Sequence, residues 1–116
     1  MAKSAIPDPL ERRHLIEREL APEQCTRIAE AYLAEGRVWD AIAFLGKAGA
    51  NDRLAALREE SIVAGDTFLV RELTRALRDE LSAARWRETA DAAEAAGKER
   101  FAAQAKRLCE RAEGRS

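Results

Sequence analysis

Apolar residues recur at steps of three and four along most of the chain, and glycines interrupt this pattern. Between residues 22 and 34 the apolar residues include Cys25, Ile28, Ala29, Tyr32 and Leu33. This spacing places them on one face of a helix. Gly36 follows where a left-handed residue can end a helix, and a second amphipathic segment begins at about Val38. The stretch 28–48 therefore predicts two helices folded back on each other at Gly36.

The same arrangement recurs around two more glycines. Gly65 lies 29 residues after Gly36 (65 − 36 = 29), and Gly97 lies 32 residues after Gly65 (97 − 65 = 32). An apolar helical segment precedes each glycine and an amphipathic segment follows it. The predicted hairpins comprise residues 22–49, 51–81 and 82–112. Because a hairpin of this kind buries its apolar face only against a neighbour, we expect the hairpins to stack.

The boundary between the second and third hairpins is the least marked in the sequence. Residues 67–96 contain neither glycine nor proline, so one continuous helix over this range is an alternative. Ser82 can cap a new helix, and we expect the chain to break there.

Signals near the two ends complete the predicted architecture. Asp8 and Glu11 have the spacing of a capping box, with Pro9 between them at the first helical position. This predicts a leading helix over 8–20. The segments expected to be flexible are the leader 1–7 and the tail 113–116. The whole chain, 1–116, is predicted to be one all-α domain, a right-handed stack of about seven helices in antiparallel hairpins.

Small and aromatic residues in the first hairpin resemble those of the tetratricopeptide repeat. The matching residues are Ala31, Tyr32, Gly36, Ala41, Ile42, Lys47 and Ala48. In the third hairpin, Trp86 and Ala102 fall at family positions, whereas Ser61 and Val70 depart from the pattern in the second. Both glycine spacings are shorter than the family period of about 34 residues. The resemblance implies a tetratricopeptide-like superhelix, and an unrelated helical bundle is the alternative.

The resemblance also implies a binding groove lined by the first helix of each hairpin. The residues expected to line it are Arg27, Glu30, Leu33, Ala56, Glu59, Ile62, Glu88, Asp91 and Glu94. This acidic and apolar set would suit a peptide or partner helix with basic and apolar side chains. The implied function is protein–protein interaction, as a small adaptor or chaperone-like module. The alternative is that these carboxylates only keep a helical surface soluble.

Charge disfavours nucleic acid and membranes as partners. Lys and Arg total 20 against 21 Asp and Glu, a formal net charge of −1, so no global field draws the protein to a polyanion. Arg71, Arg75 and Arg78 share one helix face and would be the nucleic-acid surface if there is one, although acidic residues interleave with them. A self-associating regulator with an apolar dimer face, and hence a homodimer, is the other alternative.

Few residues could support catalysis or bind a metal ion. His14 is the single histidine, and it has no partner residues at a recognisable catalytic spacing. Cys25 and Cys109 are far apart, without the spacing of a zinc or redox motif, and free thiols in a reducing cytoplasm are expected. We therefore predict no enzymatic activity, no metal and no cofactor. No stretch has the length of a membrane span or the apolar run of a signal peptide. The alanine and arginine bias is typical of a bacterial protein.

Overall fold

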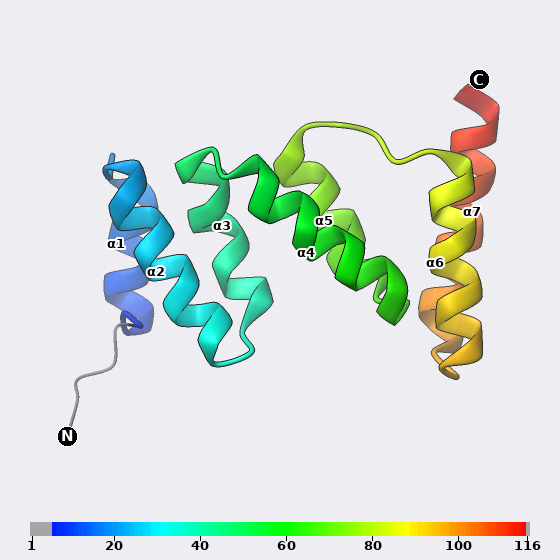
Figure 1. Cartoon of the computed structure of the whole chain (residues 1–116), viewed down its shortest axis with the longest axis horizontal. Coiled ribbons are helices and arrows are strands. Elements are labelled where there is room, and N and C mark those ends of the chain that lie inside the picture. Colours follow the sequence, from blue (N-terminus) through cyan, green and yellow to red (C-terminus); the bar gives the residue numbers. More distant parts are fainter. Residues whose placement is uncertain (1–5, 116) are drawn as a thin grey trace. The chain divides into compact units, whose positions relative to one another are not determined.

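A computed structural model of the chain describes residues 6–115, which form seven α-helices and no strand (Figure 1). The helices are α1 (Pro9–Glu17), α2 (Pro22–Ala34), α3 (Val38–Ala48), α4 (Asn51–Ala64), α5 (Thr67–Leu77), α6 (Ala83–Ala95) and α7 (Glu99–Arg115). The all-α class predicted from the hydrophobic pattern is confirmed. The first five residues of the predicted leader lie outside the described residues.

Consecutive helices pair into the predicted hairpins. Helix α2 packs against α3, and α6 lies alongside α7 (Figure 1). Arg58 of α4 contacts α5, because its Nη1 donates a hydrogen bond to Thr74 Oγ1 at 3.2 Å. The turn is the same in each hairpin: its glycine has φ of +70° to +74°, and the next backbone N–H donates back across the helix end. This motif requires a left-handed residue, which is why glycine stands there.

The helix starts follow the same spacing as the glycines. The first helices of the three hairpins begin at residues 22, 51 and 83, and the second helices begin at 38, 67 and 99. Both series step by 29 residues and then by 32 (51 − 22 and 83 − 51; 67 − 38 and 99 − 67). The glycines therefore mark equivalent points in three hairpins of slightly different length.

The contacts of the chain divide into two compact units, a division that the prediction of a single domain does not include. One unit ends at Leu54 and the other begins at Ala55, within α4. In the first unit the rings of Tyr32 and Phe44 stack with centroids 6.0 Å apart. The Arg12 guanidinium of α1 lies over both rings, at 5.7 and 5.6 Å from their centroids, and this contact holds α1 on the first hairpin.

The second unit has a core shared by four helices. Its buried members are Ile62, Val70, Leu81, Trp86, Ala90, Ala105, Cys109 and Ala112. The buried Thr67 hydroxyl donates to the Phe101 carbonyl at 2.8 Å, so the first turns of α5 and α7 are adjacent. At the other end, Arg115 Nη2 donates to the Leu81 carbonyl at 3.3 Å. The first bond therefore brings the starts of α5 and α7 together, and the second joins the end of α7 to the segment just before α6.

The predicted break at Ser82 is confirmed. Helix α5 ends at Leu77, and Ser82 caps α6 by accepting a hydrogen bond from the Arg85 N–H at 3.3 Å. The segment between the two helices is tied down by Arg58, which forms two hydrogen bonds with the Asp79 carboxylate at 2.7 and 3.1 Å. A continuous helix over 67–96 is therefore excluded.

Two predicted ends are wrong. The sequence predicts a flexible tail from residue 113, but α7 continues to Arg115, because Arg115 bonds Leu81 and forms an ion pair with Glu80 at 3.3 Å. Ser116 lies outside the described residues. The leading helix ends at Glu17, short of the predicted residue 20, because Arg18 is already extended and starts the link to α2.

Arg78, the residue that follows the last residue of α5, supplies a test of the local backbone geometry. It has φ of +56°, the left-handed region that costs a residue with a side chain about 1–2 kcal/mol. We expect Arg78→Gly to raise the free energy of unfolding by about 0.5–1 kcal/mol, after allowing for the greater flexibility of unfolded glycine. Arg75→Gly, inside the same helix, should lower it by about 1 kcal/mol. Urea denaturation measures both, and equal signs would contradict the assigned backbone conformation.

Candidate functional site

The nine residues predicted to line a groove are distributed over both units. Arg27, Glu30 and Leu33 lie on α2 in the first unit, and Ala56, Glu59, Ile62, Glu88, Asp91 and Glu94 lie on α4 and α6 in the second. All but Ile62 are exposed or half-buried. Because the set is divided between two compact units, one groove running through all three hairpins stays a prediction.

In the first unit, the acidic member of the predicted set is already paired. Both carboxylate oxygens of Glu30 accept hydrogen bonds from Arg53, one from Nε and one from Nη2, each at 3.2 Å. Arg27 is exposed and Leu33 is half-buried on the same helix. Because its charge is compensated within the unit, Glu30 has less attraction to offer a basic partner.

In the second unit, one arginine joins two of the predicted acids. Arg85 of α6 forms a hydrogen bond to Glu88 at 2.5 Å on its own helix, and its other terminal nitrogen bonds Glu59 of α4. Glu59 and Glu88 are thereby brought together across the exposed sides of α4 and α6. We call this surface the α4–α6 face and define it by five residues: Ala56, Glu59, Val63, Arg85 and Glu88.

The apolar member predicted for this face is wrong by one position. Ile62 is 2% exposed and belongs to the core, where it packs in the same cluster as Val70 and Trp86. Its neighbour Val63 is 80% exposed. The sequence alone does not decide between them, because adjacent residues of a helix point in directions only about 100° apart and both are apolar. The resemblance assigns Ile62 to the groove because it is the counterpart of Leu33. The rotation of α4 about its axis instead turns Ile62 into the core and Val63 to the surface.

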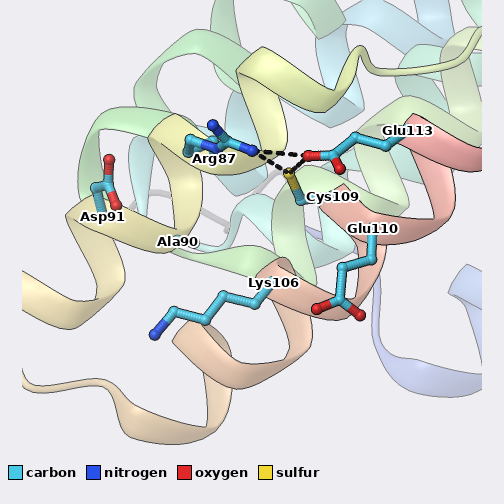
Figure 2. A pocket seen from close by; sticks show the side chains of 7 residues that line it. All are labelled: Arg87, Ala90, Asp91, Lys106, Cys109, Glu110 and Glu113. Carbon is cyan, nitrogen blue, oxygen red and sulfur yellow. Dashed lines mark hydrogen bonds and ion pairs between the residues drawn. The ribbon is translucent and has the colours of Figure 1, made fainter.

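A cavity of about 390 Å³ opens between α6 and α7 (Figure 2). Its lining residues are Arg87, Ala90, Asp91, Lys106, Cys109, Glu110 and Glu113. Figure 2 shows Arg87 reaching from α6 to Glu113 of α7, at 2.7 Å, and to the Cys109 sulfur, at 3.8 Å. The buried Cys109 thiol donates to the Ala83 carbonyl at 3.3 Å. Of the predicted groove residues, only Asp91 lines this cavity.

Both basic residues that line the cavity are paired with carboxylates. The hydrogen bond from Arg87 to Cys109, followed by the attraction of Cys109 and of the Glu113 carboxylate, raises the pKa of the Arg87 guanidinium above its ordinary value. Arg87 therefore remains a cation at any physiological pH. Lys106 forms an ion pair with Glu94 at 3.4 Å, so this acidic residue of the predicted groove set is also paired within the second unit. The cavity has a polar lining, as expected at the outer side of a terminal hairpin.

Groups that could support chemistry are dispersed. Within residues 6–115, no three His, Cys, Asp or Glu side chains gather in a way that could hold a metal ion. Cys25 and Cys109 are free and buried, and His14 is exposed on α1. The absence of an enzymatic activity stays a prediction.

The arginines of α5 are exposed as the sequence pattern indicated. Arg75 forms an ion pair with Glu72 at 2.9 Å, and Arg71 is on the same helix face. Arg78 does not share that face as predicted, because it follows the last residue of α5 in a left-handed conformation. Sequence reasoning missed a second set: Arg100, Arg107 and Arg111 of α7 are also exposed. Their spacing of seven and then four residues was the available signal, since it places all three on one helix face.

No protein-family model, curated protein or solved structure matches the chain. The tetratricopeptide resemblance therefore stays a prediction. Among the described residues, no helix combines the length and the apolar character needed to cross a membrane.

Proposed function

We propose that this chain is a protein-interaction module, a small adaptor or chaperone-like protein, and that it binds a partner on the α4–α6 face. The observation that carries the proposal is Val63, a β-branched aliphatic side chain left 80% exposed beside an organised ion network. Burying such a side chain against a partner is worth about 1.5–3 kcal/mol.

The ion network favours binding at this face because it fixes the neighbouring side chains in advance. Arg85 holds Glu59 and Glu88 in one geometry across two helices. A partner that covers Val63 then loses less free energy in ordering the rim around it, since side-chain ordering is one of the main costs of association. Exposed Ala56, two helical turns before Val63, lets the partner approach the helix closely.

The chemistry of the face defines the partner. An amphipathic helix or extended peptide would place an apolar side chain over Val63 and polar groups around it. Because Arg85 compensates Glu59 and Glu88, we expect affinity to depend mainly on the apolar contact and only weakly on salt. The free, buried cysteines Cys25 and Cys109 support a reducing compartment such as the cytoplasm. We propose no chemistry of the module's own.

Val63→Glu tests the proposal. Loss of a central apolar contact and burial of a charge should weaken a partner by about 2 kcal/mol or more, about 30-fold in affinity. Ala103→Glu is the matched control, because Ala103 is also exposed on a helix of the same unit but lies on α7. Proteins co-purifying with a tagged, nuclease-treated chain are compared for the wild type and both variants, with helicity checked by circular dichroism.

The expected result is a partner retained by Ala103→Glu and lost with Val63→Glu. Equal recovery with both variants would reject the face. Recovery of only a second copy of this chain, lost with Val63→Glu, would assign the same face to a homodimer instead of an adaptor.

A further inference from the structure

Arg12 of α1 lies in a site of the first unit that has the chemistry of a guanidinium-binding site. The ring centroids of Tyr32 and Phe44, both fully buried, are 5.7 and 5.6 Å from its central carbon. Arg12 Nη2 also donates to the Asp40 carbonyl at 3.0 Å. Two aromatic rings beside a fixed hydrogen-bond acceptor suit the planar cation of arginine better than the compact cation of lysine. We call Tyr32, Asp40 and Phe44 the arginine site.

Arg12 fills the arginine site without satisfying all of its buried polar groups. Among residues 6–115, neither Arg12 Nε nor the Tyr32 hydroxyl has a hydrogen-bond partner, although both atoms are buried. Unpaired buried polar groups are unfavourable. Because Arg12 is in the middle of α1, the backbone carbonyls around it accept hydrogen bonds within the helix and are not free for the Tyr32 hydroxyl. A ligand that brings an acceptor to this hydroxyl would therefore fit the site better than Arg12 does.

The Asp40 carboxylate is shared unequally between two arginines. Arg37 Nε donates to it at 2.8 Å, whereas Arg12 Nη2 lies 3.9 Å from its other oxygen. Arg37 also lies over the Tyr32 ring, with its central carbon 4.9 Å from the centroid. Arg12 is thus held chiefly by the two rings and the Asp40 carbonyl. Because Asp40 compensates the charge of Arg37, this second cation does not exclude a guanidinium from the site.

Helix α1, which carries Arg12, buries little of itself. None of its nine residues is buried, and Leu10 is exposed. The half-buried residues of α1 are Arg12, Leu15 and Ile16. A helix of this length is not stable alone in water, so α1 depends on its contacts with the hairpin. Loss of the Arg12 contact should therefore release α1 and unfold it.

We propose that the arginine site binds an arginine of a partner protein, presented on an extended peptide, and that α1 covers the site until the partner displaces it. An extended peptide has free backbone carbonyls, so it can supply the acceptor that the Tyr32 hydroxyl lacks. Arg12 is then an internal competitor whose tether gives it an effective concentration on the order of millimolar. The site is in the first unit and shares no residue with the α4–α6 face, so it is independent of the function proposed above.

An NMR titration of the full chain tests the proposal, with N-acetyl-arginine methylamide as the probe. The matched control ligand is N-acetyl-citrulline methylamide, in which a neutral urea group replaces the guanidinium. Arg12→Ala opens the site and should bind the arginine probe at least about 10-fold more tightly than the wild type. It should bind the citrulline probe about 10-fold more weakly than the arginine probe, because the cation–π attraction is lost. Arg13→Ala changes an exposed residue of the same helix and should bind like the wild type.

Two further measurements locate the probe and follow α1. Phe44→Leu in the Arg12→Ala background removes one ring but keeps an apolar side chain, and it should weaken the arginine probe about 10-fold. In the wild type, a saturating probe should move the amide signals of residues 9–17 toward those of an unfolded chain. Circular dichroism checks the fold of each variant. Arg12→Gln, which keeps part of the apolar stem of the side chain, replaces Arg12→Ala if the alanine variant unfolds.

Several results would overturn the proposal. One is equal binding of the arginine probe by the wild type and Arg12→Ala, or no binding by either. Another is equal affinity of Arg12→Ala for the arginine and citrulline probes. Binding by the wild type without any change in the signals of residues 9–17 would show that α1 does not cover the site. A wild-type dimer in sedimentation that Arg12→Ala abolishes would assign the site to Arg12 of a second copy and not to a partner protein.

Discussion

Replacing Gly65 by alanine is expected to destabilise the second unit by about 3 kcal/mol or more. Gly65 has φ of +70°, and a Cβ at this position would lie 2.5 Å from the Ala93 Cα and 2.7 Å from the Ala92 carbonyl carbon. Both neighbours are backbone atoms of α6, so no side chain can rotate to make room. The left-handed conformation costs about 1–2 kcal/mol and the overpacking about 1–3 kcal/mol.

Gly97→Ala is the matched control for this prediction. Gly97 ends α6 with φ of +74°, in the same unit and the same turn motif, but its added Cβ would meet no atom of residues 6–115 within 4 Å beyond its immediate chain neighbours. It should lose only the conformational term, about 1 kcal/mol. Denaturation followed through Trp86 in a Trp39→Phe background reports on the second unit alone, because these are the two tryptophans of the chain. Equal losses would mean that α4 and α6 do not approach as closely as described.

The same mutation at the two tryptophans should have very different effects. Trp86 is 5% exposed within the core of the second unit, and Trp86→Ala should cost about 3–5 kcal/mol through lost burial and the cavity left behind. Trp39 is 47% exposed on α3, and Trp39→Ala should cost clearly less, about 1–2 kcal/mol, because only part of its apolar surface is removed from water.

Both changes are measured by urea denaturation followed by circular dichroism. Tryptophan fluorescence is not comparable between the variants, because each of them lacks one of the two tryptophans. Tyr32→Phe, which changes a fully buried ring of the first unit without emptying its site, serves as the control for a core aromatic. Similar costs for Trp86→Ala and Trp39→Ala would contradict the burial assigned to each.

Features encoded by local signals could be predicted from the sequence. The turns at Gly36, Gly65 and Gly97 were predictable because a left-handed helix end selects glycine within a few residues. The start of α6 was predictable because Ser82 accepts a hydrogen bond from a backbone N–H three residues ahead. Both interactions are complete within one turn, so the residues that determine them are neighbours in the chain.

Features that depend on residues far apart in the sequence could not be predicted. Pairing of Glu30 with Arg53 and of Glu59 with Arg85 joins residues 23 and 26 positions apart, and it removes the free acidic charge that the groove hypothesis used. The exposure of Val63 in place of Ile62 depends on how α4 is rotated against the core. Trp39 shows the same limit, because only the packing of α3 against its neighbours leaves this large apolar side chain half-exposed.

The central claim is that a partner protein contacts the α4–α6 face at Val63. Photo-crosslinking tests it directly: a benzophenone amino acid replaces Val63 in one variant and Ala103 in another, and each is irradiated with the partner that co-purifies with the wild type. A crosslink from position 63 and none from position 103 is the predicted result. Crosslinks of equal yield from both positions, or from position 103 alone, would contradict the account.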